Sequence, residues 1–209
     1  MHRSSYNKMK RFKQDYLNPD DKLKILDIGS FDKNEDYNYG LILNEKKWTY
    51  HGLDLKEGNN VDIVVKDPYN WEEIKDKTYD VVVSGQAFEH IEFFWLTLEQ
   101  INRVLKPGGL FCLIVPSSGP VHRNPYDCYR FNEDGMKAMA KYINFEVLKA
   151  GTDFDAHTWQ DSYPYNSISI YALHPQYCDL RQLPAIKDEA KRAEMEQSKI
   201  GRASCRERV

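Results

Sequence analysis

Long apolar runs are missing from this sequence. The longest, Leu110–Val115, has six residues, whereas a helix that spans a membrane needs about 20 apolar residues. The polar segment 1–17 also lacks the apolar stretch of a secretion signal. We therefore expect no membrane span.

Cysteine is scarce, and its spacing carries no ligand pattern. The four residues form no CxxC pair and no Cys/His set: Cys112, Cys128, Cys178 and Cys205. A disulfide scaffold and a structural zinc site are therefore not expected, and no metal site is predicted. This cysteine usage favours a reducing, cytoplasmic setting.

The sequence also lacks a large excess of positive or negative charge. The 209 residues carry a net charge of −3, so there is no broad basic footprint, and nucleic acid is not an expected partner. Apolar residues make up 41% and charged residues 29%, which is typical of globular proteins and excludes a disordered or fibrous chain. The length suffices for one domain with a core.

The last ten residues, Ile200–Val209, have neither a helical nor a strand period. They resemble the translation of a sequencing-library adaptor, so we expect a non-native read-through after Lys199 of a truncated gene; a natural basic tail is the alternative. Because this segment holds three Arg and one Glu, removing it changes the net charge from −3 to −5. Cys205 is removed with it.

Apolar runs and helix-like segments alternate along the chain. We predict an N-terminal helix and turn over 1–22, a sheet domain over 23–175 and a charged helical segment over 176–199. The expected strands are 23–28, 49–55, 61–65, 79–84, 110–115, 145–151 and 167–173, and the expected helices are 3–17, 36–47, 71–76, 92–105 and 133–142. This alternation predicts an α/β fold with a doubly wound, mostly parallel sheet and helices on both faces.

Ligands bind such sheets at the carboxyl ends of the strands. Gly29 follows the first strand and permits a sharp turn, but the GxGxxG pattern of dinucleotide sites is absent. Asp54 ends the second strand, 25 residues after Gly29, where an acid accepts hydrogen bonds from ribose hydroxyls. Asp67 follows the third strand and could meet an adenine edge. A surface aspartate and a turn aspartate are the respective alternatives.

Five strings, in this order and spacing, resemble the class I S-adenosylmethionine-dependent methyltransferases. They are LKILDIGSFD (23–32), YHGLDL (50–55), VKDP (65–68), YDVVVSGQAFEHI (79–91) and INRVLKPGGLFCLIVP (101–116). FFWL (93–96) and PSSGPVHRNPYDCYRF (116–131) are similar to segments of small bacterial methyltransferase-domain proteins associated with surface-sugar biosynthesis. The resemblance implies a Rossmann-like sheet of about seven strands, with one antiparallel strand near the C-terminal end.

The resemblance also implies S-adenosyl-L-methionine as the cofactor. Its implied contacts are Asp27, Gly29 and Ser30 for the methionine part, Asp54 with its neighbour Leu55 for the ribose, Asp67 for the adenine amino group, and Ser84 and Gln86 for the methionine end. The family's GxGxG is Gly29-Ser30-Phe31-Asp32-Lys33 in this chain. A different loop path and partial loss of binding both fit this departure.

Methyl transfer is an in-line displacement, and the protein supplies orientation and often a base. His90 and His122 are the candidate catalytic histidines, because histidine titrates near neutral pH. Asp127 accompanies them, and bracing of a loop is the alternative role for His90. The candidate substrate contacts are Arg123, Tyr126 and Arg130, where the arginines could clamp a carboxylate or phosphate, or pair with Asp127 or Asp134 as a structural lock.

The predicted function is methyl transfer from S-adenosyl-L-methionine to a small molecule or a sugar-containing precursor. A non-catalytic cofactor-binding or interaction module remains an alternative, because the glycine loop is reduced. A nucleotide-cofactor oxidoreductase is a further alternative, against which the missing GxGxxG and the LKPGG turn both count.

Overall fold

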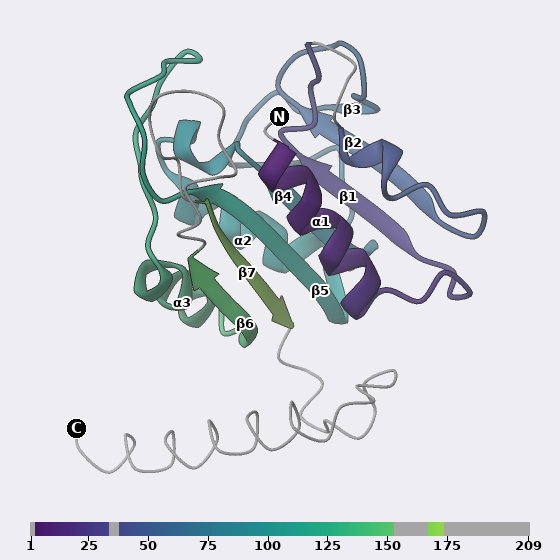
Figure 1. Cartoon of the computed structure of the whole chain (residues 1–209). Coiled ribbons are helices and arrows are strands. Elements are labelled where there is room, and N and C mark those ends of the chain that lie inside the picture. Colours follow the sequence, from purple (N-terminus) through teal and green to yellow (C-terminus); the bar gives the residue numbers. More distant parts are fainter. Residues whose placement is uncertain (1–2, 34–37, 153–166, 174–209) are drawn as a thin grey trace. The chain divides into compact units, whose positions relative to one another are not determined.

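A computed structural model describes residues 3–33, 38–152 and 167–173 (Figure 1). Residues 1–176 form one compact unit. The predicted charged segment 176–199 and the ten-residue tail lie outside the described residues. The elements are α1 (Arg3–Tyr16), β1 (Lys24–Ile28), η1 (Tyr39–Leu41), β2 (Thr49–Asp54), β3 (Ile63–Val64), β4 (Tyr79–Gly85), η2 (Phe88–His90), α2 (Phe94–Val104), β5 (Leu105–Pro116), α3 (Glu133–Tyr142), β6 (Glu146–Thr152) and β7 (Ser167–Leu173).

The strands form one sheet in the order β3-β2-β1-β4-β5-β7-β6. Strands β1 to β5 pair in parallel, with Asp27 of β1 level with Gly52 of β2 and Val83 of β4. Strand β7 runs antiparallel to β5 and β6. The predicted α/β fold with a mostly parallel sheet is therefore confirmed. The carboxyl ends of β1, β2 and β4 meet at one edge of this sheet.

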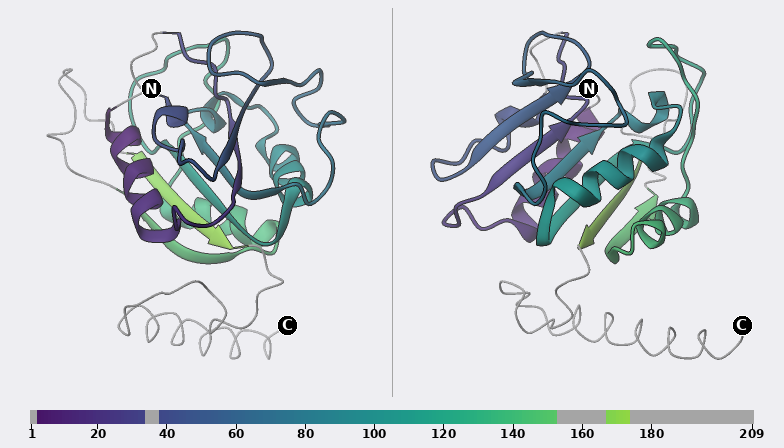
Figure 2. Two further views of the ribbon diagram at one scale, coloured as in Figure 1. Left: turned by 90° about the vertical axis from the view of Figure 1, so that its right-hand side faces the viewer. Right: turned by 180° about the vertical axis from the view of Figure 1, so that it is seen from behind.

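Apolar side chains cover both faces of the sheet, because its central strands are apolar on both sides. On one face, Met9 and Phe12 of α1 pack against Ile25, Val81 and Ile114. On the other face, α2 and α3 pack on the opposite side chains of the same strands. Figure 2 shows α1 on one side of the sheet and both other helices on the opposite side. Helices on both faces were predicted, and this is confirmed.

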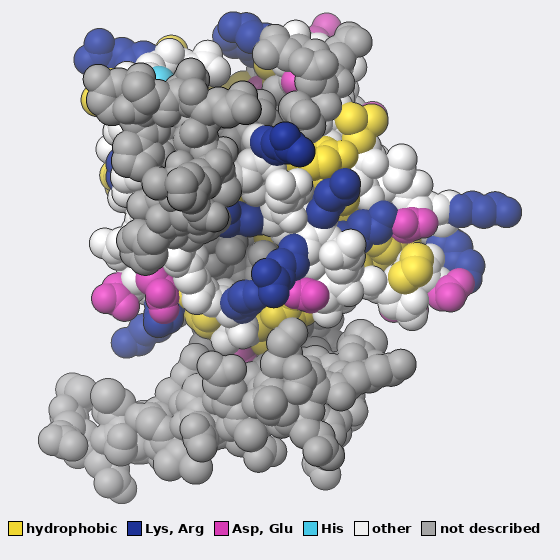
Figure 3. Space-filling model, viewed as in Figure 1, with side chains coloured by type: hydrophobic (Ala, Val, Ile, Leu, Met, Phe, Trp, Pro, Cys, Tyr) yellow, Lys and Arg dark blue, Asp and Glu magenta, His cyan; other side chains and the backbone are white. Residues whose placement is uncertain are grey.

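The periodic helices were well predicted. Helix α3 has the predicted bounds, and the side chain of Asn132 caps it by accepting a hydrogen bond from the Gly135 amide. Helix α1 begins and ends at the predicted positions within one residue. The helix carries five Lys and Arg residues and a single acidic residue, Asp15, so its exposed surface is mainly basic, and dark blue side chains lie along it in Figure 3. No helix of the described residues is long and apolar enough to cross a membrane.

Two predicted helices are wrong. Over 38–47 the structure has only the short turn η1, in which Tyr39 is fully buried and its hydroxyl lies 2.6 Å from Ser5 Oγ. Over 71–76 there are only turns, because Arg103 donates hydrogen bonds to the carbonyl oxygens of Trp71 (2.8 Å) and Ile74 (2.7 Å). In both segments, tertiary contacts override the local helical composition.

Two strands differ from their predicted bounds by more than one residue at an end. Strand β3 keeps only Ile63–Val64 of the predicted 61–65. Strand β5 begins at Leu105 rather than at Leu110, and its pairing with β4 shifts register between Tyr79 and Val81. The Lys106–Gly109 turn therefore ends helix α2 and lies within the irregular start of β5.

Candidate functional site

A sharp turn at Gly29 begins the candidate cofactor site at the carboxyl end of β1. Gly29 has a φ of +74°, and a Cβ placed there would lie 2.5 Å from the Cβ of Ala87. The Gly29 and Ser30 amides both donate to the carbonyl oxygen of Leu53, at 2.9 and 3.1 Å. The loop after β1 is thereby held against the end of β2 and the segment after β4.

A buried polar network supports the same loop where the sequence has no further glycine. The Tyr50 hydroxyl donates to Asp27 Oδ2 (2.7 Å) and accepts from Asn60 Nδ2 (2.9 Å). Asn60 Nδ2 also donates to the carbonyl oxygen of Ser30 (3.0 Å). Asn60 adopts a φ of +63°, a conformation that asparagine tolerates better than most residues. Sequence reasoning missed Tyr50 and Asn60, since no local motif connects them to the loop.

Burial raises the pKa of Asp27 to about 7, against the hydrogen bond from Tyr50, and the nearby Asp54 charge raises it further. The folded protein therefore holds a proton on Asp27 across a pH range in which the unfolded chain has released it. Protonated Asp27 therefore contributes to the stability of the fold. This contribution is complete below about pH 4 and is lost as the pH rises to about 7.

We expect Asp27→Asn to flatten the pH dependence of stability between about pH 4 and 7. The wild-type free energy of unfolding, relative to that of the variant, should fall by about 2–4 kcal/mol across this window. Urea unfolding of both ligand-free proteins at several pH values measures this difference in the free energy of unfolding. The contributions of the other titrating groups are the same in both proteins and therefore cancel. If the free energy of unfolding changed with pH in the same way in both proteins, the raised pKa of Asp27 would be contradicted.

The carboxylate of Asp54 lies beside the same loop. Its Oδ2 accepts a hydrogen bond from the Phe31 amide (3.2 Å), and its Oδ1 accepts one from the Leu55 amide (2.7 Å). The side chains of Phe31 and Leu55 are 41% and 53% exposed. A carboxylate between two exposed apolar side chains suits a ribose that carries a flat, weakly polar base. Phe31 was not predicted as a site residue.

Two buried polar atoms at this edge have no hydrogen-bond partner among the described residues: Ser30 Oγ and Gln86 Nε2. Such atoms are costly unless a ligand or water satisfies them. Gln86 follows β4 with a φ of +59°. Both residues were predicted as cofactor contacts, and their unsatisfied atoms fit a polar ligand such as the methionine part of S-adenosylmethionine.

Two other predicted cofactor residues make internal contacts. Ser84 is buried, and its hydroxyl donates to the carbonyl oxygen of Ile28 (2.9 Å), which ties β4 to β1. Asp67 is exposed, and its Oδ1 accepts from the Tyr69 amide (2.8 Å) within its own turn. Ser84 Oγ and Asp67 Oδ1 thus already have partners within the protein, unlike Ser30 Oγ and Gln86 Nε2.

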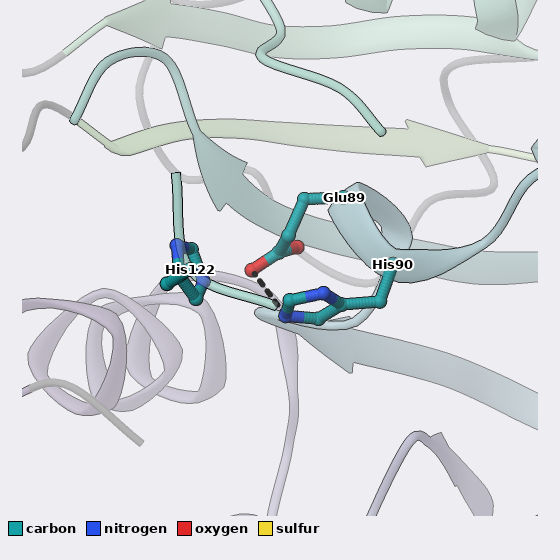
Figure 4. Close-up of side chains that lie close together, drawn as sticks. All are labelled: Glu89, His90 and His122. Carbon is teal, nitrogen blue, oxygen red and sulfur yellow. Dashed lines mark ion pairs between the residues drawn. The ribbon is translucent and has the colours of Figure 1, made fainter. Parts of the chain in front are cut away.

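A second group forms beyond the end of β4. Glu89 and His90 come from η2, and His122 comes from the loop between β5 and α3 (Figure 4). The rings of His90 and His122 meet edge to face, with centroids 5.1 Å apart. Burial lowers the pKa of His90. The structure therefore brings the two predicted catalytic histidines together.

The carboxylate of Asp127 contacts both His122 and Arg130. Its Oδ2 accepts from the His122 amide (2.7 Å) and lies 3.5 Å from His122 Nδ1. Both carboxylate oxygens accept from the guanidinium of Arg130, which holds the pKa of Asp127 well below its usual range. Arg123 is exposed, and the Tyr126 side chain is 55% exposed.

Glu89 was not predicted as a site residue. Its side chain is buried beside these histidines, and burial raises its pKa to about 7. The sequence signal available was an acid directly before a histidine in the string AFEHI, but no spacing rule marks it as buried.

Residues 40–113 match the model of a family described as "Methyltransferase domain". This match begins after the Gly29 loop, where the sequence departs from the usual glycine pattern. No curated protein matches the chain.

Solved structures of methyltransferases share the fold. Phosphoethanolamine N-methyltransferase 2 of Haemonchus contortus, in complex with phosphomonomethylethanolamine and S-adenosylhomocysteine, has a TM-score of 0.60 at 16% identity, covering 82% of this chain and 53% of its own. The chain thus spans about half the length of that protein. An S-adenosylmethionine-dependent methyltransferase of Methanosarcina mazei has a TM-score of 0.58 at 16% identity (77% and 95% covered). The [4+2]-cyclase SpnF has a TM-score of 0.63 at 13% identity (81% of each chain).

Proposed function

We propose that the chain is a class I, S-adenosylmethionine-dependent methyltransferase that transfers a methyl group to a small molecule or a sugar-containing precursor. The match of residues 40–113 to a methyltransferase-domain model and the fold shared with solved methyltransferases support this proposal. The observation that carries this proposal is Asp54 at the end of β2, with the unsatisfied Ser30 Oγ and Gln86 Nε2 at the same sheet edge. We assign the activity to a domain over residues 23–175 that is built on a seven-stranded sheet with β7 antiparallel. The proposed location of the protein is the cytoplasm. No nucleic-acid partner is proposed.

The residues at the strand ends would hold S-adenosylmethionine, which supplies an activated methyl group when bound. Asp54 would accept hydrogen bonds from the ribose hydroxyls, and Leu55 would pack beside them. Ser30 and Gln86 would meet the methionine part, close to Asp27 and Gly29. Asp67 remains the proposed contact of the adenine amino group, and its side chain would have to leave its hydrogen bond with the Tyr69 amide to reach it. Ser84 would position the end of β4.

In this proposal the histidine group would lie at the acceptor end of the site. His122 would act on the acceptor hydroxyl, and Asp127 would orient His122 through contacts at its amide and Nδ1. His90 would brace this arrangement, since its Nδ1 contacts the carbonyl oxygen of Tyr126. Arg123 and Tyr126 would contact the acceptor, whereas Arg130 would act on it only through Asp127.

A second candidate function is a cofactor-binding module with no methyl transfer. Two observations favour it: the glycine-poor loop at Gly29 and the structural similarity to SpnF, which is described as a [4+2]-cyclase. A shared fold does not fix the reaction. Because the three similar structures described above are only 13–16% identical to the chain, the acceptor has to be found by experiment.

Thermal unfolding with S-adenosylhomocysteine, with NAD and without ligand tests the cofactor assignment. We expect a rise in Tm with S-adenosylhomocysteine only, because a ligand that binds the folded state stabilises it. Stabilisation by NAD alone would favour an oxidoreductase and contradict the proposal. Transfer of a radiolabelled methyl group to candidate sugars and small hydroxyl compounds then separates an enzyme from a binding module.

A further inference from the structure

Three potential metal ligands converge beside the proposed cofactor site. One ligand atom from each of Glu89, His90 and His122 can be chosen so that all three lie within 4.8 Å of one another. In Figure 4 the Glu89 carboxylate points toward the two imidazole rings. Two histidines and one carboxylate are a common ligand set of catalytic zinc and non-haem iron sites.

The Glu89 carboxylate is an independent sign of a missing ligand. Its side chain is 1% exposed, yet neither oxygen has a hydrogen-bond partner among the described residues. The His90 Nε2 is 3.8 Å from its Oε1, which is too far for a hydrogen bond. A buried carboxylate without a partner is costly, and a cation between Glu89 and the histidines would remove that cost.

Both histidines are held through Nδ1. The Nδ1 of His90 contacts the carbonyl oxygen of Tyr126, and it must donate its proton there. The Nδ1 of His122 lies 3.4 Å from the carbonyl oxygen of Pro120, 3.5 Å from Asp127 Oδ2 and 3.4 Å from Arg130 Nη2. Arg130 Nη2 can only donate to this nitrogen, whereas the two oxygens can only accept from it; in the tautomer that serves the two oxygens, the lone pair is on Nε2. Carbonyl and carboxylate groups behind Nδ1 are the usual supports of metal-bound histidine.

From this geometry we propose that Glu89, His90 and His122 bind one divalent first-row transition ion of the zinc type. Metal bonds of about 2.0–2.1 Å place neighbouring ligand atoms about 3–3.5 Å apart, so modest movements within the cluster complete the site. Two imidazoles and one carboxylate favour such an ion over magnesium or calcium, which prefer oxygen ligands. Three protein ligands leave positions open for water or a substrate atom.

The position of the cluster suggests what the open positions would bind. Ala87, which touches Gly29 of the proposed cofactor loop, directly precedes η2. If the proposed function holds, an acceptor hydroxyl on the ion would release its proton to water nearer neutral pH. Its oxygen would then form a bond to the methyl carbon of S-adenosylmethionine while the bond between that carbon and the sulfonium sulfur breaks, and the sulfur leaves as the neutral thioether of S-adenosylhomocysteine. His122 would thereby act on the acceptor through the ion. The inferred acceptor class is a hydroxyl compound.

Cobalt binding tests the site without turnover. We expect the chelator-treated full chain to bind one Co²⁺, with visible absorption bands of nitrogen and oxygen coordination, and Zn²⁺ to displace it. Glu89→Gln, which keeps the side-chain shape, and His122→Ala should each weaken Co²⁺ binding at least tenfold. His51→Gln is the matched control, since His51 bonds the Tyr79 hydroxyl at the opposite end of β4, and it should bind as the wild type does.

The absence of stoichiometric Co²⁺ binding would overturn the proposal, as would equal affinity in both cluster variants. If Glu89→Gln does not fold, His122→Ala still decides, because His122 is partly exposed. The Tm shift of the metal-free protein with S-adenosylhomocysteine reports on the cofactor site alone. A failed metal site is therefore distinguishable from a failed cofactor assignment.

Discussion

Asp54→Ala is expected to weaken the binding of S-adenosylhomocysteine by about 10- to 100-fold. A hydrogen bond to a charged group contributes about 1.5–3 kcal/mol, and a carboxylate at the end of β2 can accept from both ribose hydroxyls. The loop itself should persist, because the Gly29 and Ser30 amides remain bonded to the carbonyl oxygen of Leu53. Isothermal titration calorimetry measures the loss.

Asp20→Ala is the matched control for this prediction. Asp20 is an exposed aspartate in the turn before β1, at the opposite edge of the sheet from Asp54, so its removal should leave the affinity unchanged. Asp54→Asn keeps one acceptor oxygen and should fall between the wild type and Asp54→Ala. Equal affinity of the wild type and Asp54→Ala would remove Asp54 from the cofactor site.

The site residues that could be predicted from the sequence are those whose positions follow from the parallel sheet. Apolar runs located β1 and β2, and the rule that ligands lie at their carboxyl ends then selected Gly29 and Asp54. Gln86, which follows β4, was implied by the resemblance to methyltransferases. These residues do lie at that edge, because the topology fixes where a strand ends regardless of side-chain detail. Helix α3 was predictable to the residue, since its period and its Asn132 cap are both local signals.

The rest depended on contacts between distant residues. Segment 38–47 looks helical, but burial of Tyr39 against Ser5, 34 residues earlier, imposes a single short turn. Asn60 supports the Gly29 loop across 30 residues through its amide, and a sequence pattern cannot show this. For the same reason, Glu89 and His122 are 33 positions apart in the chain and meet only because η2 and the loop after β5 lie together.

His122→Ala is expected to lower kcat by about 10²- to 10⁴-fold and to leave the affinity for S-adenosylhomocysteine unchanged. This is the range that a positioned acid–base group contributes, and loss of a metal-held acceptor hydroxyl would also reduce turnover sharply. The substitution keeps the local fold, because Asp127 accepts from the backbone amide of residue 122 and from Arg130, and neither contact needs the imidazole. Steady-state kinetics with the acceptor found in the radiolabel assay gives kcat.

Metal content and pH together distinguish the two ways in which His122 could act. If it binds the ion, His122→Ala loses both bound metal and turnover, and added Zn²⁺ restores little of either at concentrations that saturate the wild type. If it is a simple base, metal content is the same in both proteins, and the variant instead loses the fall in kcat/KM at acid pH that a titrating histidine causes. Unchanged kcat in His122→Ala would exclude both roles and leave the Asp127–Arg130 pair as a structural lock of the loop.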